Sequence, residues 1–165
     1  MTPQRRSYEA GHTPKCLVLV DETPECDRAV YYASRWAQRV QGGVVMLHVI
    51  NTADHNQQWR GIADIMRAEA HEEADIALNR ASGRANGLSA IVPERLTREG
   101  TDPCEEILHA IEEDTDIALL VLAASTRPDG PGPIVTALAR TTGSFPIPLI
   151  VVPGHLSDAE IAALS

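Results

Sequence analysis

Short, uninterrupted runs of apolar residues recur along this chain, and longer amphipathic segments separate them. Runs of this length without alternation are typical of strands that are buried on both faces. They predict strands at 15–20, 44–50, 117–124 and 149–152. A fifth segment, 88–97, alternates more and contains Pro93, which lacks the N–H that a central strand must donate. We therefore expect this fifth segment to be an edge strand.

The segments between these strands carry apolar residues at three- and four-residue spacing, which predicts helices. The first helix should begin at Thr23 and Pro24, because threonine is a good N-cap and proline suits the first helical position. The other helices are expected at 59–84 after a polar loop at 51–58, from Asp102 onward, at 133–142, and after Ser157. Asn86-Gly87 should end the second helix, and Gly143 should end the fourth in the left-handed conformation of a C-terminal cap.

Strict alternation of strands and helices predicts the fold class. Each parallel crossover needs a helix, so the pattern indicates an α/β, doubly wound parallel sheet of five strands with helices on both faces. The length of 165 residues suits a single domain. We expect a flexible extension at 1–14, the α/β domain at 15–154 and a helical tail at 155–165.

Charge and composition narrow the classes of function. The formal net charge is −9 and basic residues are not clustered, which argues against a nucleic-acid partner. No apolar run approaches the length of a membrane span, and the three widely spaced cysteines suit reduced thiols, so we expect a cytoplasmic protein without a membrane partner. Neither a metal-ligand pattern nor a G-x-S-x-G elbow is present, so no catalytic or metal-binding residue is predicted.

The strongest candidate for a ligand site lies where the two central strands end. Ligands of doubly wound sheets bind beyond the carboxyl ends of the strands, where the winding reverses. The strands at 15–20 and 117–124 are the natural central pair; Asp21 ends the first, and small or hydroxyl residues at 123–126 end the second. Two interpretations stay open, because Asp21 suits either a nucleotide crevice or a plain turn into the first helix.

Several segments, taken in order, resemble the universal stress protein family. They are the run Cys16–Asp21, the helix with Ala29 and Ala33, Met46–Val49, Gly100–Pro103 and Phe145–Val152. The resemblance spans roughly 15–154, and it implies the strand order 3-2-1-4-5 and a homodimer formed through the last strand. An apolar edge at 145–152 would need such a cover.

One branch of this family binds ATP through a glycine motif that begins directly after the fourth strand. Gly130, Gly132 and Gly143-Ser144 look like that motif, but Gly143 falls at a helix C-terminus, where carbonyl groups would repel a phosphate. Aligned from the closing strand, the motif falls instead on Ala123, Thr126 and Val135-Thr136, with a loop one residue shorter. The three glycines of the motif are therefore absent.

The loop after the fourth strand also offers few phosphate donors. Pro128, Pro131 and Pro133 have no N–H, and Asp129 adds a repulsive charge. Arg127 is able to hold a phosphate bidentately, although a solvated loop arginine is the plainer interpretation.

We therefore expect a universal stress protein-like homodimer that acts in stress response or regulation. It should be a binding module that lacks tight ATP binding, and the sequence favours a non-enzymatic role over an enzyme. The alternative is an ATP-binding member with a rebuilt phosphate loop and at most slow hydrolysis. If an adenine nucleotide binds, the resemblance implies a contact from Asp21 to ribose or base and from the backbone of Val49 to adenine. It implies phosphate contacts from Thr126, Arg127 and Thr136, in a crevice that Ala123 and Val135 complete.

Overall fold

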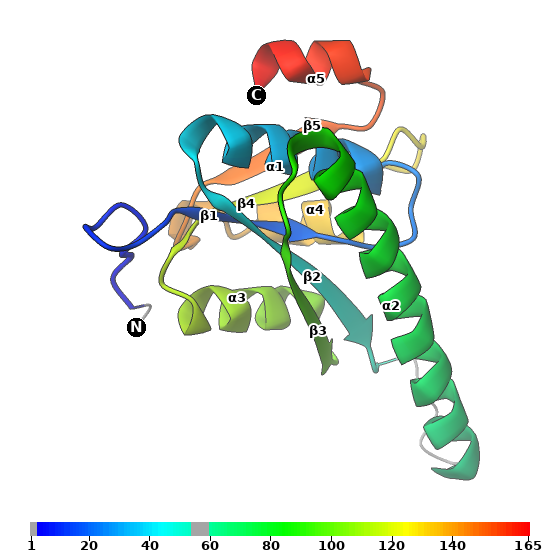
Figure 1. Cartoon of the computed structure of the whole chain (residues 1–165). Coiled ribbons are helices and arrows are strands. Elements are labelled where there is room, and N and C mark those ends of the chain that lie inside the picture. The colour runs from blue at the N-terminus through cyan, green and yellow to red at the C-terminus, as the bar shows by residue number, and fades with distance from the viewer. Residues whose placement is uncertain (1–2, 54–59) are drawn as a thin grey trace.

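The computed structural model describes residues 3–53 and 60–165, and it forms a sheet with helices on both faces (Figure 1). The expected polar loop at 54–58 and the expected helix start at Trp59 lie outside these residues. In chain order the elements are β1 (Lys15–Leu19), α1 (Cys26–Val40), β2 (Gly43–Asn51), α2 (Arg60–Ser89), β3 (Glu94–Gly100), α3 (Pro103–Glu113), β4 (Ile117–Ala124), α4 (Pro133–Ala139), a 3-10 turn (Thr142–Ser144), β5 (Leu149–Pro153) and α5 (Asp158–Leu164).

All four strand pairs are parallel, and the sheet order is β3-β2-β1-β4-β5. This order confirms the predicted fold class and the central position of β1 and β4. Because β1 is flanked on both sides, its successive residues point alternately into two buried layers, so its residues after Lys15 are all apolar.

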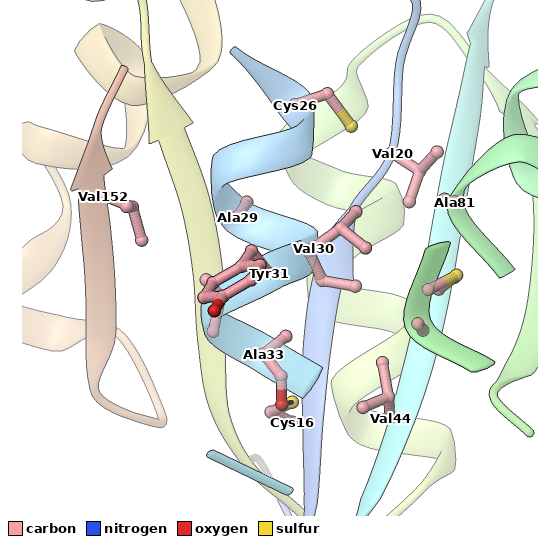
Figure 2. Close-up of a cluster of buried hydrophobic side chains, with 14 of the residues drawn as sticks. Cys16, Val20, Cys26, Ala29, Val30, Tyr31, Ala33, Val44, Ala81 and Val152 are labelled. Carbon is pink, nitrogen blue, oxygen red and sulfur yellow. Dashed lines mark hydrogen bonds between the residues drawn. The ribbon is translucent and has the colours of Figure 1, made fainter. Parts of the chain in front are cut away.

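Two cores lie on the opposite faces of the sheet. On one face, Cys16 and Val18 of β1 pack beneath α1, α2 and α5. Figure 2 shows this core, in which the small side chains of Ala29 and Ala33 lie on the face of α1 that packs on the strands. On the other face, Leu17 packs with residues of α3 and α4. Small alanines allow helices to approach the sheet closely, which explains a core with few aromatic residues.

Three predicted element boundaries are wrong. Helix α1 begins at Cys26, because the N–H and the hydroxyl of Thr23 both donate to Asp21 Oδ1 and hold 21–25 as a turn. Helix α2 continues through Asn86-Gly87 to Ser89, and Ala90 takes the left-handed conformation with φ 55°. Strand β3 begins after Pro93 instead of containing it, although its predicted edge position is confirmed.

Both terminal segments contact the domain. The Arg5 guanidinium donates to the carbonyl oxygens of Ile111 and Asp114, at 2.7 Å and 3.0 Å. At the other end, α5 packs on α1, with Ile161 buried in the core beneath it. Figure 1 shows α5 lying above α1.

Candidate functional site

The candidate site is a crevice between the carboxyl ends of β1 and β4. Asp21, Ala123 and Val135 line it, together with the loop residues Pro131 and Gly132. Three residues predicted from the sequence are thus brought together from three separate elements. The topology does this, because β1 and β4 lead their connections away on opposite faces of the sheet.

The position of Asp21 agrees with both roles that the sequence left open, a turn into the first helix and a residue of a ligand crevice. Its Oδ1 accepts hydrogen bonds from the N–H of Thr23 at 2.9 Å and from the Thr23 hydroxyl. The carboxylate therefore stabilises the turn into α1, and it also lines the crevice. The second carboxylate oxygen accepts no hydrogen bond from the described residues, so it stays available to a ligand.

The crevice is small. Its volume is about 150 Å³, whereas pockets that hold small-molecule ligands measure roughly 300–1,000 Å³. Pro131, Gly132 and Pro133 lie in the space between the strand ends, and Ile134 and Val135 close the side toward α4. The crevice adjoins a larger hollow of about 480 Å³, and Thr23, Glu25, Gly132 and Pro133 line both.

Several backbone N–H groups of the loop after β4 donate hydrogen bonds to acceptors within the same loop. The N–H of Ser125 donates to Pro131 O at 3.0 Å, that of Arg127 to Ser125 Oγ at 3.1 Å, and that of Gly130 to Arg127 O at 3.2 Å. A phosphate nest needs successive N–H groups that point outward without partners. Because these three N–H groups already have acceptors within the loop, they are not free to form one.

The glycines of this loop differ from the expected arrangement in one respect. Gly130 and Gly132 have φ values of 119° and 111°, which only glycine adopts without strain. Gly143 lies in the 3-10 turn without a positive φ, so its prediction as a left-handed cap is wrong. Helix α4 ends at Ala139, before the predicted end at Thr142. The hydroxyls of Thr141 and Thr142 donate hydrogen bonds to carbonyl oxygens of its last turn.

The remaining predicted site residues lie around the crevice instead of inside it. Arg127 and Thr136 line a neighbouring hollow of about 480 Å³, and Thr126 lines a third hollow with Arg127. The hydroxyl of Thr136 donates to Gly132 O at 2.8 Å, which satisfies it within α4. Val49 is half-buried against the core beneath α3 and does not line the crevice.

Sequence reasoning missed Arg140 in this neighbourhood. It lines the same hollow as Arg127, one helical turn beyond Thr136, and no ion pair joins either arginine to the described residues. The available signal was the four-residue spacing from Thr136 to Arg140, which places both on one face of a helix. Glu25 and Asp129 line the hollow too, so its charges are mixed.

Two groups near the strand ends are already satisfied. The ring of His48 is buried, and its Nδ1 lies 2.9 Å from Val20 O. Burial raises the pKa of the Cys26 thiol to about 12, so this thiol stays protonated at neutral pH. Within 3–53 and 60–165, acidic, histidine and cysteine side chains do not gather in threes as a metal site requires.

The five-stranded parallel sheet with helices on both faces defines the class as a doubly wound α/β protein. The family model described as "Universal stress protein family" matches residues 13–153, so the chain belongs to the universal stress protein family. A search of curated proteins found no match. None of the helices that the structure describes is both long enough and apolar enough to cross a membrane.

Solved structures of this family share the fold at low sequence identity. UspA from Lactobacillus plantarum is 20% identical with a TM-score of 0.68, over 84% of this chain and 97% of that one. A universal stress protein from Archaeoglobus fulgidus in complex with dAMP is 15% identical with a TM-score of 0.59, over 84% and 96%. A crystal structure described as a universal stress protein in complex with cAMP is 16% identical with a TM-score of 0.61, over 86% of this chain and 97% of that one.

Proposed function

We propose that this universal stress protein is a binding or interaction module of the cytoplasm, active in stress response or regulation, that lacks tight ATP binding. The observation that carries the proposal is the 150 Å³ crevice at the ends of β1 and β4. Pro131–Pro133 line this small crevice, and the N–H groups of Ser125, Arg127 and Gly130 in the same loop donate to acceptors within the loop.

The test is direct. The purified protein is denatured and the supernatant is assayed for adenine nucleotide, and the native protein is then titrated with Mg-ATP by calorimetry. We expect no released nucleotide and no heat of binding at micromolar ATP. Micromolar binding that Asp21→Ala abolishes would overturn the proposal, because it would show that the crevice opens to hold the nucleotide.

A second candidate function is ATP binding through a rebuilt phosphate site. It is favoured by the 480 Å³ hollow beside the crevice, where Arg127 and Arg140 stand with the hydroxyls of Ser125 and Thr136. Arginine holds phosphate oxygens bidentately and does not need a glycine nest. Structural neighbours solved with dAMP and cAMP make an adenine nucleotide the natural ligand to try.

The two candidates are separated by arginine variants. If Mg-ATP binds with a Kd that Arg127→Gln and Arg140→Gln each raise by about tenfold, the rebuilt site is correct. If ATP does not bind, or if binding is indifferent to both arginines, the second candidate fails and the first stands or falls on the Asp21 result.

We also propose that the functional unit is a homodimer formed through β5. Within the described residues β5 pairs with β4 alone, so its other edge presents free backbone groups. The side chain of Val151 on this strand is 43% exposed. An unpaired apolar edge strand is normally covered, and a second copy of the same strand is the simplest cover.

A further inference from the structure

A second hollow adjoins the crevice at the turn after β1, where Asp21, Thr23 and Cys26 line both. It is enclosed by the turn that joins β1 to α1 on one side and by α2 on the other, and its volume is about 330 Å³. This is more than twice the volume of the crevice and falls within the range of small-ligand pockets. Neither the phosphate loop nor any residue of α4 lines it.

The floor of this hollow is apolar and built from small side chains. Val30 and Cys26 of α1 face Ala77 and Ala81 of α2. Figure 2 shows Cys26 and Val30 on the side of α1 that faces Ala81, so the space between the helices is bounded by short side chains. The neutral Cys26 thiol behaves here as a small apolar group.

One charged pair on the rim is compensated within the protein. Asp27 Oδ1 accepts from Arg84 Nε at 2.9 Å, and its other oxygen accepts from Arg28. Arg84 also donates to both oxygens of Asp158, at 3.1 Å. Asp27 and Arg84 are therefore structural, and they leave little charge for a ligand to complement.

The remaining charges on the rim lie on opposite walls of the hollow. Arg80, on the α2 wall, is exposed and makes no hydrogen bond or ion pair with any described residue. The turn opposite contributes Asp21, with one free carboxylate oxygen, and the exposed Glu22, which lies 3.8 Å from His48 Nε2. An acidic wall thus faces a basic one across an apolar floor.

From this arrangement we propose that the hollow binds a small zwitterion with an amine at one end, a carboxylate at the other and an apolar stem between them. The ammonium group meets Asp21 and Glu22, the carboxylate meets Arg80, and the stem lies on Val30 and Ala81. A simple anion is disfavoured because two acidic side chains share the rim with Arg80, and a simple cation leaves Arg80 without a partner. Asp21 lines both this hollow and the crevice, whereas Arg80 lines only this hollow, so Arg80 is the residue that tells the two sites apart.

The test uses ε-aminocaproate as the probe, with caproate and hexylamine as probes that each carry one of the two charged ends. Backbone amide NMR of the full chain follows each titration. We expect ε-aminocaproate to shift signals in 21–30 and 77–84, and we expect caproate and hexylamine to bind at least about tenfold more weakly.

Two arginine variants make the result specific. Arg80→Gln removes an exposed, unpaired side chain and should leave the fold intact while raising the Kd of ε-aminocaproate by about tenfold. The matched control is Arg140→Gln, an exposed arginine on the other face of the sheet, which should leave this Kd unchanged. The proposal is overturned if ε-aminocaproate produces no localised shifts, if caproate or hexylamine binds as well, or if both arginine variants behave alike.

Discussion

The carboxylate of Asp158 on α5 lies 2.7 Å from the guanidinium of Arg28 on α1. The second guanidinium, that of Arg84, lies 3.1 Å away, so one acidic residue joins the C-terminal helix to both α1 and α2. Hydrogen bonds from Arg28 and then Arg84 hold the pKa of Asp158 below its usual value of 3.8. The contact is half-exposed, with 51% of the Asp158 side chain accessible.

Asp158→Asn should therefore loosen α5. Because the folded-state pKa is lowered, the contribution to stability is present above the unfolded value of 3.8 and is lost as the pH falls below it. For an exposed pair, we expect a loss of at most about 1 kcal/mol at neutral pH and faster hydrogen exchange of the α5 amides. The variant should be less sensitive to acid than the wild type.

The control for this variant is Glu160→Gln, an exposed acid on the same helix that forms no ion pair with the described residues. Urea unfolding at neutral pH and at pH near 3 measures both variants. Equal loss of stability in acid for the wild type and Asp158→Asn would show that other carboxylates dominate.

Val151→Glu should convert the proposed dimer to a monomer. The change places a charge on the exposed edge of β5, where a second copy of the strand would have to bury it. Light scattering at micromolar concentration should give a dimer for the wild type and a monomer for the variant. Val92→Glu is the matched control and should remain a dimer, since Val92 is 83% exposed next to the opposite edge strand. A wild-type protein that is monomeric at this concentration would contradict the proposed dimer.

Gly154→Ala should destabilise the domain, because the chain after β5 passes too close to β4 for a side chain. An added Cβ would lie 2.4 Å from Ala124 O and 3.1 Å from Glu25 Cβ. We expect a loss of roughly 1–3 kcal/mol in the free energy of unfolding, measured by urea. Gly87→Ala in α2 meets no atom within 4 Å and should instead gain roughly 0.5–1 kcal/mol.

The three cysteines should differ in reactivity. Burial raises the pKa values of Cys16 and Cys26 to about 12, and the Cys104 thiol, with a pKa that burial also raises, is less enclosed. Ellman's reagent on the native protein should therefore modify Cys104 first, Cys26 more slowly because its thiol stays protonated, and the fully buried Cys16 only at the rate of unfolding. Cys104→Ser should remove the early phase; an early phase that survives would contradict this order.

The strands were within reach of the sequence because they rest on strong local signals, whereas their order was implied by the resemblance to the family. The runs at 15–20 and 117–124 are apolar at nearly every position, which only a central parallel strand requires. Boundaries were less secure, since single contacts decide them. The hydrogen bond from Thr23 to Asp21 holds the preceding residues in a turn, so α1 begins later than predicted. Helix α2 continues through Asn86-Gly87, although that pair was predicted to end it.

The sequence by itself determined that this chain is a five-stranded α/β domain without the family's phosphate glycines, because apolar periodicity and residue identity are properties of neighbours along the chain. Only the tertiary structure decided how Asp21, Ala123 and Val135 meet, and that Pro131–Pro133 lie between them. It also placed Arg80 opposite Asp21 across a second hollow. Such arrangements depend on the packing of elements distant in sequence, where a few ångströms separate an open pocket from a filled one, and no local pattern encodes that distance.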